Sequence, residues 1–173
     1  MLFRGKQYKR IAINIKPRLE FKKVLDLLEE IEISDLGTKP QNIKYALLEM
    51  INNSIRAHRE HHIEKPLTVV LEDDSPSLTI EVRDRGPGFD PELLPYSLSE
   101  DPNEIDVKSD AFVRYREKNN YKRFGMGLYV VRKTFSDFNL LFLDADGNTI
   151  KWEPGKVRGT LIKVSIERET ERE

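Results

Sequence analysis

Residues 40–61 carry the pattern that most restricts how this chain can fold. Apolar or small side chains recur there every three or four positions, at Ile43, Leu47, Met50, Ile51, Ser54 and Ala57. That spacing is the period of one face of an α-helix. Thr38 and Pro40 are residues typical of a helix start. A long helix with one apolar face needs a second layer of structure to cover it.

Strand patterns supply that second layer. LTVVLED (67–73) and LTIEVRD (78–84) are rich in β-branched residues and flank the turn-like DDSPS, which predicts a hairpin. Further strands are expected at 8–15, 139–144, 148–153 and 160–167, and further helices at 17–32 and 125–137. We therefore expect an α/β (α+β) two-layer sandwich, with a mixed, largely antiparallel sheet covered by helices on one face. The length of 173 residues suits a single domain, 1–173.

Composition excludes several classes of protein. Lys and Arg total 29 against 30 Asp and Glu, so bulk charge does not favour nucleic-acid binding. The chain has no cysteine, which excludes disulfides, thiolate metal sites and cysteine nucleophiles. No apolar run approaches the roughly 20 residues of a membrane helix, and the N-terminus does not resemble a signal peptide. We expect a cytoplasmic protein that binds neither nucleic acid nor membrane.

Two polar residues four positions apart on the long predicted helix are the first candidates for chemistry. Glu49 and Asn53 share one side of that helix, at the edge of its apolar face. A carboxylate can take a proton or orient water, and an amide oxygen suits hydrated Mg²⁺. Taken alone, this segment favours a simple polar pair on the helix surface.

A glycine-rich segment, DRGPGF, directly follows a predicted strand at 84–89. The carboxylate of Asp84 could accept a hydrogen bond from an exocyclic amine such as that of adenine. Gly86 and Gly88 would let the backbone approach a flat ligand closely. An ordinary strand-to-loop turn would have a similar sequence.

A second glycine-rich segment, RFGMGL, leads into the predicted helix after residue 124. Gly125 and Gly127 free backbone amides at a helix N-terminus, which favours phosphate, and Arg123 adds positive charge. Thr160, near the start of the last predicted strand, could bond a base or a water beside it. A P-loop, G-x-x-x-x-G-K-[ST], is absent from the sequence.

Residues 91–124, between the two glycine-rich segments, lack regular periodicity and contain few aliphatic side chains. Such a long excursion is typical of a lid or a disordered segment. We call it the lid segment and expect it to be mobile without ligand, with 112–124 ordering over a bound ligand. The tail, 168–173, is expected to fray.

Three histidines, His58, His61 and His62, lie within one turn of the long predicted helix. They could form a metal site, but the interpretation favoured here is a solvated helix end.

The order of these features adds a resemblance to a known family. E-x-x-x-N on a helix, D-x-G-x-G, a long lid, G-x-G-L on a helix and G-T resemble the GHKL ATPase superfamily with the Bergerat ATP-binding fold. EMINNSIRAH resembles its N box, DRGPGF its G1 box and RFGMGL its G2 box. The resemblance covers about residues 8–167 and implies that the chain binds ATP and Mg²⁺.

The resemblance also implies roles for individual residues. Asn53 matches the Asn that binds Mg²⁺, Glu49 the acidic residue that activates a water or hydroxyl, and Asp84 the adenine-reading Asp. Arg56 falls where histidine kinases carry a Lys near the phosphates. The other matches to nucleotide-binding positions are Gly86, Gly88, Arg123, Gly125, Gly127, Leu128 and Thr160.

Within the superfamily, the chain is most similar to the small anti-sigma-factor serine/threonine kinases, because no histidine precedes the N box. That resemblance implies a protein partner: a sigma factor, an anti-sigma-factor antagonist or another phosphoacceptor protein. A homodimer is left open. Two alternatives remain. One is a separated catalytic domain of a sensor histidine kinase. The other is a non-catalytic, nucleotide-gated binding module whose lid presents Phe112, Tyr115 and Tyr121 to its partner.

Overall fold

The computed structural model describes residues 1–33, 40–74, 76–119 and 126–167. Its main sheet has the strand order β3-β5-β6-β9-β7-β8, and every described pairing in it is antiparallel. These strands are β3 (Arg10–Ile15), β5 (Leu67–Asp73), β6 (Ser77–Arg83), β7 (Asp137–Leu143), β8 (Thr149–Ile150) and β9 (Gly159–Glu167). The predicted hairpin is the β5–β6 pair, so this part of the prediction is confirmed.

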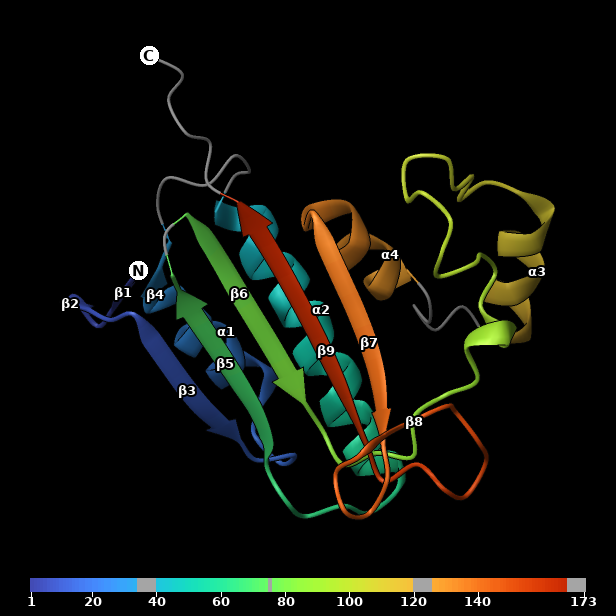
Figure 1. Cartoon of the computed structure of the whole chain (residues 1–173), viewed down its shortest axis with the longest axis horizontal. Helices are drawn as coiled ribbons and strands as arrows, with labels where there is room; N and C mark the ends of the chain where they lie inside the picture. The colour runs from blue at the N-terminus through green and yellow to red at the C-terminus, as the bar shows by residue number, and fades with distance from the viewer. Residues whose placement is uncertain (34–39, 75, 120–125, 168–173) are drawn as a thin grey trace.

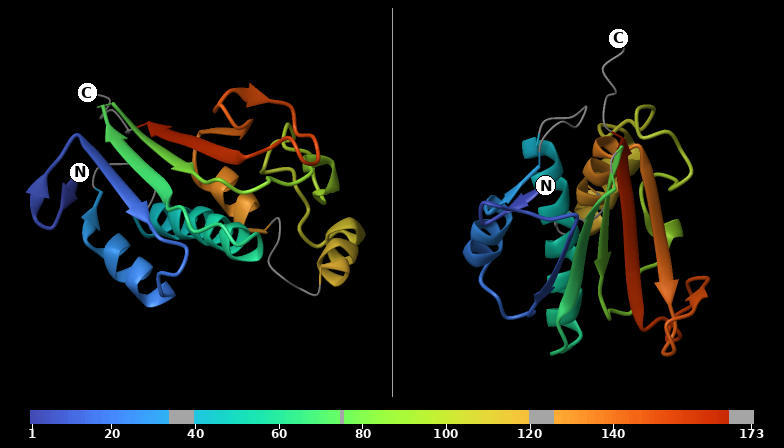
Figure 2. Two further views of the ribbon diagram at one scale, coloured as in Figure 1. Left: turned by 90° about the horizontal axis from the view of Figure 1, so that it is seen from below. Right: turned by 60° about the vertical axis from the view of Figure 1, so that its left-hand side comes forward.

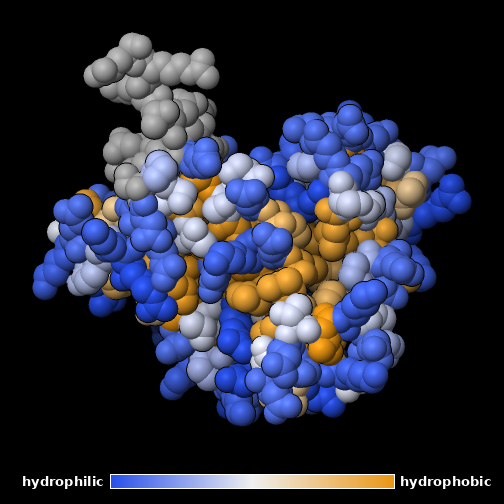
Figure 3. Space-filling model, viewed as in Figure 1, coloured by the Kyte–Doolittle hydropathy of each residue, from blue (hydrophilic) through white to orange (hydrophobic). Residues whose placement is uncertain are grey.

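Three helices cover one face of this sheet, as Figures 1 and 2 show. They are α1 (Phe21–Glu29), α2 (Pro40–Glu60) and α4 (Met126–Thr134). The apolar face of α2 is buried against the strands, with Ile43, Met50 and Ile51 fully inaccessible. The predicted α+β sandwich with helices on one face is confirmed. The sheet, expected to be mixed and largely antiparallel, is antiparallel in every described pairing. Figure 3 views the opposite face of the sheet, where apolar side chains show among polar ones.

The N-terminal helix is shorter than predicted. It begins at Phe21 instead of residue 17, after Glu20 in an extended conformation. Arg59 of α2 donates hydrogen bonds to the carbonyl oxygens of Pro17 (2.7 Å) and Leu19 (3.1 Å). The carbonyl oxygens of Pro17 and Leu19 are therefore hydrogen-bonded to α2. Helix propensity alone places the start of α1 too early, because it takes no account of Arg59, which lies 40 residues after Leu19 in the sequence.

A second, small sheet was not predicted. It has the order β2-β1-β4, made of β1 (Leu2–Phe3), β2 (Lys6–Gln7) and β4 (Ile31–Glu32). Each strand has two residues, too few to show an alternating pattern. Thr38 and the rest of 34–39 lie outside the described residues, as does the tail at 168–173.

The described part of the lid segment, 91–119, has regular structure where an irregular excursion was expected. It contains the 3₁₀ turn η1 (Pro91–Leu93) and the helix α3 (Asp110–Lys118), which Figure 1 shows beside the main body. Aromatic residues replace the missing aliphatics. Phe112 is buried and stacks on Tyr96 with ring centroids 5.6 Å apart, and Ile105 completes a second small core. The expectation of an irregular segment is therefore wrong for 91–119, while its mobility without ligand stays a prediction.

Arg132 of α4 anchors this segment to the main body. Its side chain is buried and donates hydrogen bonds to the carbonyl oxygens of Ser97 and Glu100. Its guanidinium also lies over the Tyr96 ring, 5.8 Å from the centroid.

Among the described helices, none combines the length and the apolar character needed to span a membrane.

Candidate nucleotide site

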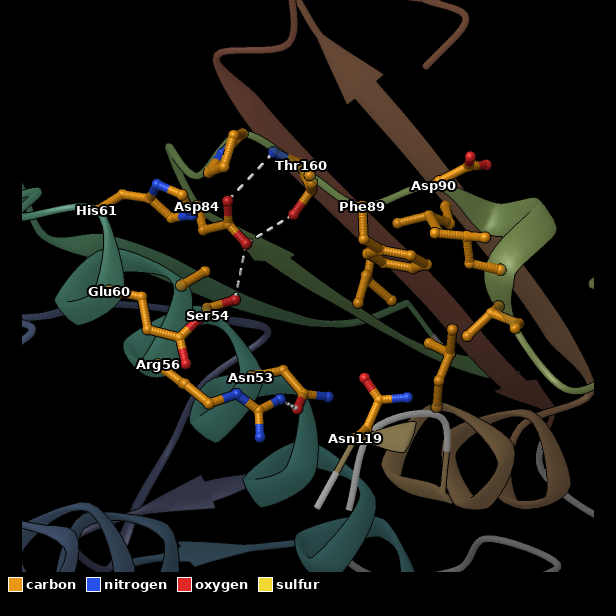
Figure 4. Close-up of a pocket in the computed structure, with 18 of the residues that line it drawn as sticks. Asn53, Ser54, Arg56, Glu60, His61, Asp84, Phe89, Asp90, Asn119 and Thr160 are labelled. Carbon is orange, nitrogen blue, oxygen red and sulfur yellow. Dashed lines mark hydrogen bonds between the residues drawn. The ribbon is translucent and has the colours of Figure 1, made fainter. Parts of the chain in front are cut away.

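The site is built around Asp84, the first residue after β6. β9 runs beside β6, and the backbone N–H of Asp84 donates to the Thr160 carbonyl at 3.0 Å. The carboxylate is buried and turns towards α2 and the start of β9, as Figure 4 shows. A buried carboxylate is costly unless hydrogen bonds compensate it, so its donors decide whether it can remain charged.

Four donors meet this carboxylate. Oδ1 accepts from the backbone N–H of Gly86 (2.8 Å) and of Thr160 (3.3 Å). Oδ2 accepts from the hydroxyls of Ser54 (3.0 Å) and Thr160 (2.6 Å). The two amides are fixed by the backbone, whereas a hydroxyl can rotate and also accept. Oδ2 is therefore the oxygen that can exchange a hydroxyl donor for a ligand amine.

Glu49, Asn53 and Gly127 come together although 74 positions separate Asn53 from Gly127. A Cβ added at Gly127 would lie 2.5 Å from Glu49 Oε2 and 3.4 Å from Asn53 Nδ2. Glycine at 127 thus allows the first turn of α4 to approach the carboxylate and the amide on α2. The structure thus brings the N box and the G2 box into contact.

Arg56 lies next to Asn53 on α2. Its guanidinium donates to Asn53 Oδ1 at 2.7 Å, so the amide oxygen matched to the metal-binding position faces a cation in this structure. A ligand that carries Mg²⁺ would have to take this oxygen from Arg56. The positive charge of Arg56 could then pair with a phosphate, consistent with the position expected for Arg56.

A pocket of about 310 Å³ joins Asp84 to Asn53 and Arg56, a volume within the range of small-molecule sites. Glu49 and Gly127 are not among its lining residues and lie next to it, through their contact with Asn53. Asn53, Ser54 and Arg56 line it from α2, Asp84 and Gly88 from the strand end and its loop, and Leu128 from α4. Thr160 and Ile162 of β9 form part of its wall. The pocket lies between α2, the sheet and the lid segment, as expected for a nucleotide site in this fold.

The lid segment contributes residues that the sequence did not suggest. Tyr115, Lys118 and Asn119 at the end of α3 line the pocket, and Figure 4 labels Asn119 among the side chains that line it. Burial raises the pKa of Tyr115, and the charge of nearby Arg56 partly offsets that rise. Phe112 is buried in the lid core, so it is not presented to a partner in this structure, whereas Tyr115 is half-buried at the pocket wall. Tyr121 lies outside the described residues.

Two glycines allow close approaches within the chain that a side chain would prevent. Gly88 has φ +68°, and a Cβ there would lie 2.9 Å from the Phe142 ring. Gly159 has no room for a Cβ either, because it would lie 2.7 Å from the backbone oxygen of Asp84. The second contact, missed in the sequence, lets β9 bring Thr160 against the carboxylate.

Two site predictions fall outside the described residues, namely Arg123 and Gly125. Ser54 was interpreted only as part of the apolar face of the helix. It is buried, as expected, but its hydroxyl is a donor to Asp84. The position of Ser54 next to Asn53 in the sequence was the one feature that could have indicated a role in the site. No sequence feature indicated that residues of α3 line the pocket, because that helix was not predicted.

The prediction of a solvated histidine cluster is wrong for one member. His61 and His62 are exposed, but His58 is fully buried and both of its ring nitrogens are hydrogen-bonded. Within the described residues, no three His, Asp or Glu side chains gather into a metal-binding group. A single Asn oxygen still fits Mg²⁺, which usually keeps several waters and binds through one or two protein ligands together with substrate phosphates.

Comparison with known proteins agrees with this geometry. The family model of the histidine kinase-like ATPase domain matches residues 19–152, which includes the N box, the G1 box, the lid segment and the G2 box. No curated protein matches the chain. The match covers most of the 173 residues, and the structure has the antiparallel sheet and the helix layer of the Bergerat fold. The chain therefore belongs to the histidine kinase-like ATPase family of the GHKL superfamily and is an ATP-binding domain.

Proposed function

We propose that this domain is a Mg·ATP-dependent protein kinase that phosphorylates a Ser or Thr of a partner protein, as anti-sigma-factor kinases do. The observation that carries the proposal is the position of Glu49. Its Oε2 atom lies against Gly127, at the start of α4 and beside Asn53. A carboxylate at the meeting point of the phosphate-binding helix and the metal-binding amide is suited to proton transfer from an attacking hydroxyl.

Different residues would bind the base and the phosphates of the nucleotide. Asp84 Oδ2 would accept the exocyclic amine of the base in exchange for a hydroxyl. The backbone amides in the first turn of α4 have no partner within the helix, and the helix dipole favours negative charge there. Arg56 from α2 and Lys118 from α3 add positive charge to the pocket wall. These groups would hold a nucleotide with its base at Asp84 and its phosphates near the start of α4, which Glu49 contacts.

Phosphoryl transfer depends mainly on positioning and on neutralising charge. When bound, Mg²⁺ supplies charge neutralisation at the phosphates, and Asn53 Oδ1 is the protein oxygen that would hold it. Glu49 would accept the proton of the attacking Ser or Thr hydroxyl. The α3 end of the lid segment, with Tyr115 and Asn119 on the pocket wall, would exclude water that competes with that hydroxyl.

The test uses the whole chain with labelled ATP and Mg²⁺, alone and with candidate partner proteins encoded nearby. Acid-stable phosphoserine or phosphothreonine on a partner supports the proposal, provided that Glu49→Gln removes it. Acid-labile phosphate on a histidine of another chain would instead identify a separated histidine-kinase domain. Binding without transfer to any partner would identify a nucleotide-gated binding module. His58 itself is an unsuitable phosphoacceptor, because it is buried and both of its nitrogens are hydrogen-bonded.

A further inference from the structure

His58 is the one histidine of the three that the molecule encloses completely. It lies near the C-terminal end of α2, one turn after Ser54, with none of its surface exposed. Nδ1 lies 3.0 Å from the carbonyl oxygen of Lys65, and Nε2 lies 2.9 Å from the backbone nitrogen of Arg85. The ring therefore bridges the segment that leaves α2 and the residue that directly follows Asp84.

The chemistry of these partners fixes the proton on the ring. A carbonyl oxygen only accepts, so Nδ1 must carry the hydrogen. A backbone N–H only donates, so Nε2 must be unprotonated. His58 is consequently neutral in one tautomer. A second proton on Nε2 would place two donors against each other.

Three consecutive backbone amides are held in three different ways at this point. The N–H of Asp84 donates to β9, at the Thr160 carbonyl. The N–H of Gly86 donates to the Asp84 carboxylate itself. The N–H of Arg85, between them, is held by His58. β6 ends at Arg83. At Arg85 the acceptor for the backbone N–H is therefore the His58 side chain of α2 and not a carbonyl of a neighbouring strand.

We propose that His58 is a positioning residue for the nucleotide base. By holding the amide of Arg85, it fixes the backbone between Asp84 and Gly86 relative to α2. The direction of the Asp84 carboxylate, and its distance from Ser54, depend on that backbone. His58 therefore fixes Asp84, the residue that reads the base, relative to α2, the helix that carries Glu49 and Asn53. This inference rests on the ATP-binding role of Asp84.

Two substitutions separate the two bonds of the ring. His58→Asn keeps a donor at the distance of Nδ1 and can still reach Lys65, but it has no acceptor for Arg85. His58→Gln places an amide oxygen at the distance of Nε2 and can accept from Arg85, but it gives up the bond to Lys65. Both remove an aromatic ring from a buried position, so each serves as the stability control for the other.

The experiment measures the affinity of each variant for a non-hydrolysable ATP analogue with Mg²⁺, by calorimetry well below the unfolding temperature. We expect His58→Gln to bind within about threefold of the original chain and His58→Asn to bind about tenfold or more weakly, the usual consequence of leaving a buried donor unsatisfied. Equal affinities for the two variants would overturn the proposal, because a purely structural histidine gives no reason for Gln to rescue binding.

A second measurement keeps the two proposals apart. Amide hydrogen exchange at Arg85, without nucleotide, should be slow in the original chain and in His58→Gln, and at least tenfold faster in His58→Asn. If the original chain failed to bind the ATP analogue, the proposed function would fail, while Arg85 exchange would still decide whether His58 holds this turn. Fast exchange at Arg85 in the original chain would overturn the positioning role directly.

Discussion

Asp84 combines two fixed donors and two rotatable ones on a single buried carboxylate. This division makes a substitution at Asp84 informative about ligand binding. An Asn side chain keeps one oxygen for the two amides. Its NH₂ group can donate to the hydroxyls of Ser54 and Thr160, which rotate to accept. The fold should survive, whereas the acceptor for a ligand amine is replaced by a donor.

We therefore expect Asp84→Asn to weaken ATP binding by about 1.5–3 kcal/mol or more, the value of a hydrogen bond to a charged group. Circular dichroism and the urea unfolding midpoint should change little. Calorimetry with an ATP analogue and Mg²⁺ measures the loss. An unchanged affinity with an intact fold would show that Asp84 does not read the base.

Glu49 and Asn53 are neighbours on one helix with different expected roles. Glu49→Gln should leave Mg·ATP affinity within a few-fold and lower phosphoryl transfer about 10²–10⁴-fold, the range for a lost general base. Asn53→Ala should instead remove the dependence of binding on Mg²⁺. Binding with and without Mg²⁺, together with single-turnover transfer, separates the two. Transfer at the original rate in Glu49→Gln would make that carboxylate structural.

At the scale of elements, the lid segment illustrates why periodicity missed a helix. α3 buries a single residue, Phe112, so it has no apolar stripe to detect. Its capping signals were present: the Ser109 side chain accepts from the N–H of Phe112, and basic residues occupy the last turn. The element forms because Phe112 finds Tyr96 and Ile105 in the folded chain.

Arg132 should control how firmly this segment is attached. Arg132→Met keeps an unbranched stem over Tyr96 but removes the donors to the carbonyls of Ser97 and Glu100. We expect faster amide hydrogen exchange across 96–118, with unchanged exchange in β5 and β6. Lys133→Met, which removes an exposed hydrogen bond to Asn103, is the matched control. Equal exchange in both variants would contradict the anchoring role of Arg132.

For the molecule as a whole, the pocket is the place where the helix layer, the sheet and the lid segment meet. Residues from α2, the G1 loop, the lid segment, α4, β7 and β9 line it. A ligand there contacts parts of the chain that separate on unfolding, so it binds only the folded state. Binding free energy then adds to the free energy of unfolding.

Mg·ATP analogue at 100 times its Kd should stabilise the domain by about 2.7 kcal/mol. For a chain of this size that corresponds to an increase in Tm of roughly 5–10 °C. Differential scanning fluorimetry measures it, with Asp84→Asn at the same ligand concentration as the control. An equal shift in that variant would indicate binding somewhere other than this pocket.

Local periodicity and short motifs encode the long α2 helix, the β5–β6 hairpin and the positions of Glu49, Asn53 and Asp84, so these could be predicted before folding is considered. Features that depend on distant partners appear only in the folded chain. Arg59 held Pro17 outside a helix, Phe112 ordered the lid segment, and Gly159 brought Thr160 to the Asp84 carboxylate. His58 changed from a solvated helix end to an enclosed bridge for the same reason. Burial and hydrogen-bond partners are set by residues far along the chain, which no local pattern records.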